Sequence, residues 1–158
     1  MEPWNSFPLG SHRPGFTVVE LLVALGLTAV LLAMAALAWP RIDAAMQLDA
    51  GVQQLAADLH QAQTLAIASA ARVRLVFTRG SGRYRRERAD DAGTYRRELD
   101  RELPRGIRVG DVNSGGDLVF TARGQGENRT VTLEDRRGTR RDVRLNQRGR
   151  VTVLRVGG

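Results

Sequence analysis

An apolar segment near the N-terminus constrains this chain more than any other feature. From Phe16 to Trp39, 24 residues contain a single charged side chain, Glu20. As a helix rising 1.5 Å per residue, the segment would be roughly 36 Å long, which exceeds the hydrocarbon core of a bilayer at about 30 Å. We therefore expect residues 16–39 to form a membrane-spanning helix.

Two other interpretations of this segment are open. Ala36-Leu37-Ala38 before Trp39 resembles a signal-peptidase site, but the apolar run is longer than the usual 7–15 residues or so of a signal core. A plain anchor is the second alternative. Glu20 speaks against both, because a carboxylate in a lipid-facing helix costs about 2.5–3.5 kcal/mol at the centre and less near the end. Its presence indicates a partner.

The residues around Glu20 carry a family resemblance. Gly15 precedes Phe16, Glu20 follows four residues later, and an unbroken apolar helix continues (GFTVVELLVALGLTAVLLAMAALAW). This string resembles the N-terminus of type IV pilin-like proteins, the pilins and pseudopilins. The resemblance implies that a prepilin peptidase removes residues 1–15 as a leader on the cytoplasmic side and that the new amine of Phe16 is methylated. It also implies that Glu20 pairs with the terminal amine of a neighbouring subunit.

After Pro40 the apolar residues return to helical spacing, which predicts an amphipathic helix over residues 40–71. Asp58 is expected among its polar faces, Pro40 could kink it and Gly51 could weaken it. The expected buried stripe contains Ile42, Met46, Val52, Leu55, Leu59, Ala62, Ala66 and Ala70.

Alternation of apolar and polar residues predicts a β domain over residues 72–158, with glycine-containing turns between the strands. One face of each strand is expected to pack on the helix. The predicted strands are Val73–Thr78, Arg83–Arg88, Ile107–Val112, Leu118–Thr121, Thr130–Glu134, Arg141–Leu145 and Val151–Val156.

A helix running into a first strand (ADLHQAQTLAIASAARVRLVF) is followed later by GDLVFTARGQGENRTVTLEDRRGTRRDVRLNQRGRVTVL. This pattern resembles the H-class pseudopilin domain, which is shared by the minor pseudopilin H of type II secretion systems and the FimT/FimU minor pilins. The resemblance covers residues 13–80 and 117–156. It implies an α+β, pilin-like fold in which a long N-terminal hydrophobic α-helix packs on a C-terminal antiparallel β-sheet domain.

Charge divides the chain unequally. Residues 1–71 hold 2 Arg and 5 acids, a net charge of −3, whereas residues 72–158 hold 22 Arg and 12 acids, a net charge of +10, which together give the +7 of the chain. A basic domain can bind phosphate backbones. FimT-like proteins carry a terminal Gly-Arg-x-Arg motif that binds DNA, and this chain has Arg148-Gly149-Arg150 with Arg155 nearby but lacks the second Arg of the motif.

The other interpretation of the basic domain is a solvated surface of mixed charge, in which Arg residues between positions 83 and 105 alternate with acids. We favour this interpretation. The paired acids Asp90-Asp91 and Glu134-Asp135 are expected to be solvated at turns, and His60 is expected on the helix surface.

No catalytic or metal site is expected. The chain has no Cys, two His and no Lys, which excludes disulfides, Cys-ligated metals, thiol nucleophiles and Lys Schiff bases. No serine lies in a nucleophile-elbow context, and Gly124-Gln125-Gly126 lies between strand patterns and not before a helix, as a phosphate-binding loop would. We expect no cofactor.

The resemblance implies a minor pseudopilin of a type II secretion system, a structural subunit near the tip of the periplasmic pseudopilus. The expected partners are the prepilin peptidase, the major and minor pseudopilins and the inner-membrane secretion platform. The expected location is the bacterial inner membrane, spanned once, with a cytoplasmic N-terminus and a periplasmic C-terminal domain. The alternative is a FimT-like minor type IV pilin that binds DNA or primes pilus assembly.

Overall fold

A computed structural model describes residues 15–113 and 115–155, and it divides the chain into one unit that ends at Trp39 and a second that begins at Pro40. The helix α1 (Val18–Ala68) contributes residues to both units, and its assignment continues through Pro40. The predicted leader, residues 1–15, lies outside the described residues except for Gly15.

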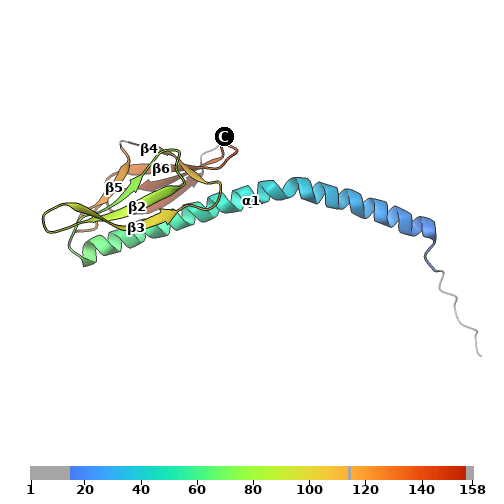
Figure 1. The fold of residues 1–158 in the computed structure, drawn as a ribbon, viewed down its shortest axis with the longest axis horizontal. Coiled ribbons are helices and arrows are strands. Elements are labelled where there is room, and N and C mark those ends of the chain that lie inside the picture. The colour runs from blue at the N-terminus through green and yellow to red at the C-terminus, as the bar shows by residue number, and fades with distance from the viewer. Residues whose placement is uncertain (1–14, 114, 156–158) are drawn as a thin grey trace, which may run out of the picture. The chain divides into compact units, whose positions relative to one another are not determined.

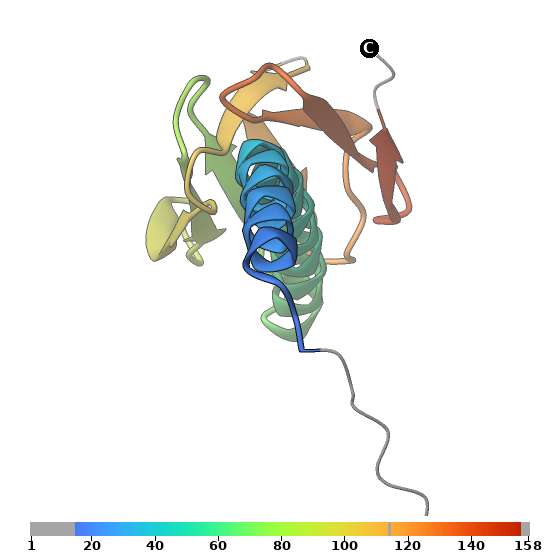
Figure 2. The same ribbon diagram turned by 90° about the vertical axis from the view of Figure 1, so that its right-hand side faces the viewer.

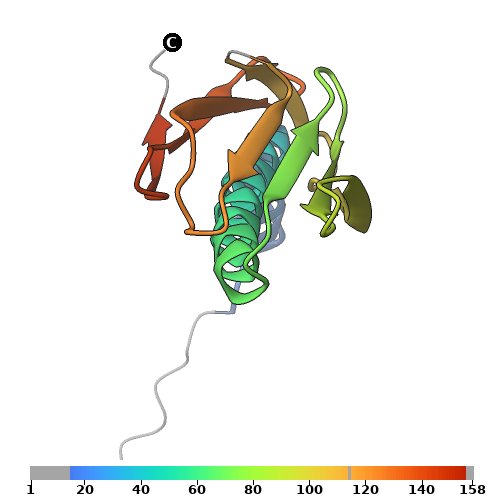
Figure 3. The same ribbon diagram turned by 90° about the vertical axis from the view of Figure 1, so that its left-hand side faces the viewer.

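Eight antiparallel strands follow the helix and form two four-stranded sheets, in the orders β3-β2-β1-β5 and β4-β6-β7-β8. Figures 1, 2 and 3 show both sheets beside the second half of α1. The bounds are β1 Val73–Phe77, β2 Arg83–Ala89, β3 Tyr95–Glu102, β4 Arg108–Val112, β5 Asp117–Phe120, β6 Arg129–Glu134, β7 Arg140–Leu145 and β8 Val151–Arg155.

A single hydrophobic core joins the helix to both sheets. The turn between β1 and β2 also ties the sheets together, because Gly80 donates its N–H to the carbonyl of Val109 (2.7 Å) and Val109 donates to Ser81 (2.9 Å). Leu48, Val52, Leu55, Leu59, Ala62 and Ala66 of α1 are buried against Leu75, Leu118 and Phe120 of one sheet and Val109, Val131, Leu133, Val143 and Leu145 of the other.

The expected fold class is confirmed, but three expected members of the buried stripe are not buried. Ala70 lies past the end of α1 and is exposed, as are Ile42 and Met46. Ile42 is 56% exposed and Met46 is 66% exposed, because the packed part of the helix begins at Leu48. The helix also continues without interruption through Gly51. The missing side chain of Gly51 leaves room for Ile107 and Pro104. A Cβ at position 51 would lie 3.4 Å from a carbon atom of each, which is van der Waals contact.

Two expectations about acidic residues are wrong. Asp58, placed among the polar faces, is 8% exposed and lies in the core interface. Asp135, expected to be solvated, is 4% exposed. It is buried because its Oδ1 closes a turn by accepting the backbone N–H groups of Arg137 (2.8 Å) and Thr139 (2.9 Å). His60 is exposed, as expected.

The strand β3 was not predicted. Its sequence, YRRELDRE, has no buried residue, so it lacks the alternation by which the other seven strands were recognised. It forms because it pairs with β2 along its length, with a register shift between Arg86 and Glu87. As the edge strand of its sheet it tolerates a charged surface, which also protects an edge against aggregation.

Candidate assembly site

The helix begins with a reciprocal pair of hydrogen bonds between Thr17 and Glu20. The Thr17 Oγ1 accepts the N–H of Glu20 at 3.2 Å, and the Glu20 Oε2 accepts the N–H of Thr17 at 3.5 Å. This is the arrangement of a capping box, in which side chains accept N–H groups at the start of a helix. Here the bond to Thr17 is the shorter of the two, and the bond to Glu20 is long. Sequence reasoning missed the role of Thr17, although the spacing Thr-x-x-Glu is its signal.

The helix surface around this cap is apolar and uncovered. Every residue from Phe16 to Leu37 is exposed, and Phe16 itself is 83% exposed. The most apolar stretch of the helix has a mean hydropathy of 2.6 and none of it is buried within the described structure. A surface of this kind requires lipid or the apolar helices of other subunits.

The Glu20 carboxylate is therefore a charge on an otherwise apolar surface. It lies in the first turn of α1, where the partial positive charge of a helix N-terminus favours an anion. Its 3.5 Å contact with Thr17 is long for a hydrogen bond, so the carboxylate remains able to accept a stronger donor. Gly15 and Phe16 precede the cap directly.

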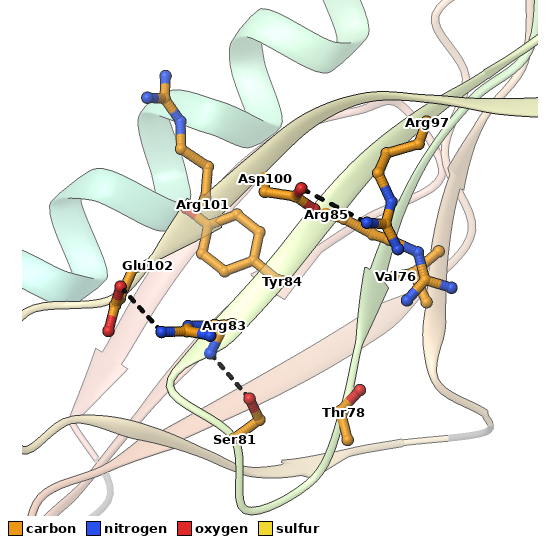
Figure 4. Close-up of a pocket in the computed structure, with 10 residues that line it drawn as sticks. All are labelled: Val76, Thr78, Ser81, Arg83, Tyr84, Arg85, Arg97, Asp100, Arg101 and Glu102. Atoms are coloured by element: carbon orange, nitrogen blue, oxygen red, sulfur yellow. Dashed lines mark hydrogen bonds and ion pairs between the residues drawn. The ribbon is translucent and has the colours of Figure 1, made fainter.

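The Arg-rich sheet surface is a second candidate site. A cavity of about 450 Å³ lies over β1, β2 and β3, and Figure 4 shows its charged side chains gathered on one surface. Within it Arg83 pairs with Glu102 and Arg97 with Asp100, each at 3.6 Å, while Arg101 reaches toward α1. The guanidinium groups in this cavity already have carboxylate partners.

Beside this cavity Glu87 joins two guanidinium groups. It accepts hydrogen bonds from Arg85 (2.6 Å) and Arg74 (2.7 Å), and Arg74 also pairs with Asp117 (3.0 Å). The bonds from Arg85 and then Arg74 outweigh the effect of burial and hold the pKa of Glu87 below its usual value. Such paired charges make a surface of mixed charge, which agrees with the favoured interpretation of residues 83–105 except at Arg105, which has no ion pair to a described residue.

Four Arg residues that pair with no described carboxylate lie after the end of α1, in the loop between β5 and β6 and in the turn between β7 and β8. Arg72 and Arg123 line one shallow cavity, and Arg148 lines another that shares Gln125 with the first. Arg148 and Arg150 flank the turn glycine Gly149 and are exposed. We call Arg72, Arg123, Arg148 and Arg150 the distal Arg set; none of the four has an ion pair to another described residue. The side chain of Arg155, at the end of β8, lies outside the described residues.

The turn that carries Arg148 and Arg150 is held by Asn146. Its Oδ1 accepts the N–H groups of Arg148 (3.0 Å) and Arg150 (2.9 Å), so both Arg side chains leave the turn from fixed backbone positions. Within the described part of the chain, no three His, Asp or Glu residues are grouped as a metal site would require.

These features define a class of protein. An apolar N-terminal helix with a carboxylate in its first turn, whose second half packs on an antiparallel β domain, is the pilin-like fold. The family model described as type II transport protein GspH matches residues 51–149, and the model of the prokaryotic N-terminal methylation motif matches residues 10–36. The chain belongs to the GspH family. This is a family of structural pseudopilin subunits and not of enzymes, and the chain is a membrane-anchored protein with a periplasmic domain.

Solved structures with the same fold come from both kinds of filament system. The minor pseudopilin EpsH of the Vibrio cholerae type 2 secretion system is 14% identical, with a TM-score of 0.60, over 71% of this chain and 99% of that one. The type IV minor pilin FimU of Pseudomonas aeruginosa is 18% identical, with a TM-score of 0.56, over 68% of this chain and 87% of that one. A comparison with curated protein sequences gave no match.

Proposed function

We propose that this chain is a minor pseudopilin of a type II secretion system, a subunit near the tip of a periplasmic pseudopilus that supports protein export across the outer membrane. Membership of the GspH family and the likeness to EpsH support this proposal. Its function is assembly: the apolar surface of α1 leaves the bilayer and packs among the helices of other pseudopilins.

The observation that carries the proposal is the position of Glu20. Cleavage between Gly15 and Phe16 by a prepilin peptidase creates an amine four residues before Glu20, and methylation keeps that amine cationic. The Glu20 carboxylate pairs with the Phe16 amine of a neighbouring subunit, so that two charges that are costly in an apolar setting neutralise each other. The N-terminus faces the cytoplasm, where the peptidase and the secretion platform act.

The first test is the mass of the mature chain. The proposal expects an N-terminus at methylated Phe16, and an N-terminus at Trp39 would show that the segment is a cleaved signal instead. A mature chain that still begins at Met1 would indicate a membrane anchor that no prepilin peptidase cleaves.

The second test separates the pairing role of Glu20 from its capping role. Glu20→Ala should strongly reduce incorporation into filaments, because it removes the carboxylate. Thr17→Val removes the capping hydroxyl but keeps that carboxylate, so it should cost the helix roughly 1 kcal/mol and leave incorporation largely intact. Equal loss in both variants would mean that Glu20 acts through the helix cap alone.

A second candidate function, a FimT-like minor pilin that binds DNA, is favoured by the distal Arg set and by the likeness to FimU. DNA binding by the full chain in detergent would weaken steeply with salt, since each phosphate contact releases counterions. Replacing Arg148, Arg150 and Arg155 by Gln would flatten that salt dependence. Absence of binding at modest salt would favour the secretion role.

A further inference from the structure

A second group of Arg residues without partners lies at the opposite end of the β domain, beside the start of its helix. A cavity of about 420 Å³ is lined by α1 residues from Pro40 to Gln47, by the turn before β4 and by the turn between β6 and β7. We call it the Pro40 cavity. Arg105, Arg136 and Arg137 line it and are exposed. None of them has an ion pair to a described residue, unlike the Arg residues of β2 and β3.

The two carboxylates that face this cavity, Asp43 and Asp135, offset the charge of its three Arg residues only in part. Asp135 is buried, and its Oδ1 is occupied by the N–H groups of Arg137 and Thr139. Asp43 is exposed, and its Oδ1 accepts a long 3.5 Å hydrogen bond from Gln47. Asp135 keeps its charge and acts on Arg137. The three guanidinium groups still outnumber the two carboxylates, and an anion from outside the chain would find N–H donors that no described residue accepts.

The cavity is also partly preorganised. Gly106 has a φ of +84°, and the Arg136 side chain lies across it, with Nε 3.3 Å and Cδ 3.6 Å from where a Cβ would stand. A side chain at position 106 would displace Arg136. Packing of the Arg136 stem on the backbone lowers the entropy lost on binding, and the planar guanidinium fork matches the oxygens of a phosphate.

The position of the cavity in the sequence identifies the source of that anion. Pro40 directly follows Trp39, the last residue of the apolar segment. The helix residues of the cavity extend to Gln47, seven residues further, which corresponds to roughly 10 Å of helix rise. The polar headgroup region adds about 5–8 Å on each side of the hydrocarbon core. Because the first residue of the cavity is joined directly to the apolar segment, a chain anchored by residues 16–39 would keep this cavity near the membrane surface, within reach of lipid phosphates.

We propose that the Pro40 cavity binds the phosphate of an anionic phospholipid at the membrane surface, through Arg105, Arg136 and Arg137. The bound lipid holds the β domain on the bilayer before the subunit enters a filament, and entry requires release of that lipid. This proposal rests on the membrane anchoring of the chain and is independent of which filament the subunit joins.

The test uses the full chain in lipid nanodiscs that contain phosphatidylcholine with increasing amounts of phosphatidylglycerol. Hydrogen exchange should slow at residues 105–107 and 135–139 as phosphatidylglycerol increases, and not in phosphatidylcholine alone. Because each Arg near an anionic surface contributes about 1 kcal/mol, each replacement should raise the phosphatidylglycerol fraction needed for half-protection about fivefold.

Three variants and one control with inorganic phosphate decide the outcome. Replacing Arg105, Arg136 and Arg137 by Gln should abolish the protection, and replacing them by Lys should retain part of it. Replacing Arg72, Arg123 and Arg148 by Gln removes the same charge elsewhere and should change nothing. Equal loss in the two Gln variants would overturn the assignment to a lipid site. The same protection on adding inorganic phosphate to nanodiscs of phosphatidylcholine alone would also overturn it.

Two measurements keep this test separate from the proposed function. Co-purification of each variant with the nanodiscs reports on the anchor, which depends on residues 16–39 and not on the cavity. Thermal unfolding of each variant should show a folded domain, because the replaced Arg residues are exposed. Anchored, folded protein without protection at either turn would refute the lipid site while leaving the pseudopilin proposal intact.

Discussion

The hydroxyl of Tyr84 on β2 donates a 2.5 Å hydrogen bond to the Oδ2 of Asp58 on α1. Arg101 on β3 donates to the same oxygen at 3.2 Å, and Gln54 on α1 reaches the Tyr84 hydroxyl at 3.4 Å. Tyr84 also stacks on Phe77, with ring centroids 5.4 Å apart. The buried Asp58 carboxylate thus links β2 and β3 to the helix, at a position on the buried stripe where a nonpolar residue would be expected.

We predict that Asp58 and Tyr84 are energetically coupled. Asp58→Ala should destabilise the domain by about 2–4 kcal/mol, because it leaves the Tyr84 hydroxyl and the Arg101 guanidinium without their acceptor. Tyr84→Phe keeps the ring stacking and should cost about 1–2 kcal/mol. The double variant should be less destabilised than the sum of the two, by at least about 0.5 kcal/mol in a urea-unfolding cycle.

Asp49 provides the control for this cycle. It pairs with Arg141 at 3.5 Å but is 54% exposed, so Asp49→Ala should change the free energy of unfolding by less than about 1 kcal/mol. Strict additivity of Asp58→Ala and Tyr84→Phe would show that their hydrogen bond contributes nothing to stability.

The same pair predicts a loss of stability at alkaline pH. Burial, followed by the hydrogen bond with Asp58, raises the pKa of Tyr84 above its usual value of about 10. The unfolded chain therefore releases this proton at lower pH than the folded chain does. The stability contributed by Tyr84 is complete below about pH 10 and declines as pH rises toward the folded pKa.

Urea unfolding at several pH values, together with tyrosinate absorbance, checks this prediction. In a Tyr95→Phe background, absorbance reports Tyr84 alone, because the chain has two Tyr. We expect the native protein to resist ionisation above pH 10 and Tyr84→Phe to lose stability less steeply there. Ionisation of Tyr84 near pH 10 in the folded protein would contradict the burial argument.

Sequence reasoning located most of the fold because most elements have an apolar face. Seven strands alternate, and the helix beyond Leu48 repeats every three to four residues. The strand β3 was not predicted, because it is stabilised by pairing with β2 and has no buried face that its sequence could reveal. The burial of Asp58 was not predicted, because a charged residue was assumed to face solvent. Its spacing indicates burial: it follows Leu55 by three residues and precedes Ala62 by four, which places it on the buried stripe.

The candidate sites were predictable to different degrees. Gly15, Phe16 and Glu20 form a local motif, which a sequence displays directly. The Pro40 cavity joins α1 to turns that lie 58 or more residues later in the chain, so its Arg residues gain their common location through the fold. The sequence around Arg105 does not distinguish it from Arg101. Yet Arg101 pairs with Asp58, and Arg105 pairs with no described carboxylate.

The end of α1 offers a stabilising substitution. Ala71 donates its N–H to Ala66 and Ala70 donates to Ile67, each at 3.2 Å, which is the Schellman pattern. Ala70 has a φ of +48°, in the left-handed region that costs a residue with a Cβ roughly 1–2 kcal/mol. Ala70→Gly should therefore raise the free energy of unfolding by about 1 kcal/mol.

Ala57→Gly is the matched control, because Ala57 is exposed in the interior of the same helix. It should destabilise by about 1 kcal/mol, since glycine loses more backbone entropy in a helix. Chemical denaturation of the two variants side by side should thus give changes of opposite sign. A loss of stability in Ala70→Gly would show that the helix terminus does not hold the left-handed conformation.

The last prediction concerns the glycine between Arg148 and Arg150. Gly149 has a φ of +76°, and a Cβ there would stand 1.9 Å from the Gln63 Nε2 and 2.9 Å from the carbonyl oxygen of Gly124. Gly149→Ala should cost about 2–4 kcal/mol through backbone strain and displacement of the turn from α1. Gly138→Ala, at φ +82° with no atom within 4 Å of the new Cβ, should cost only the strain of roughly 1–2 kcal/mol. Adding Gln63→Ala should rescue part of the Gly149→Ala loss and none of the Gly138→Ala loss in thermal unfolding. If the two glycine variants were equally destabilised, the turn would not be packed on the helix, and the distal Arg set would lose the contact that fixes its position.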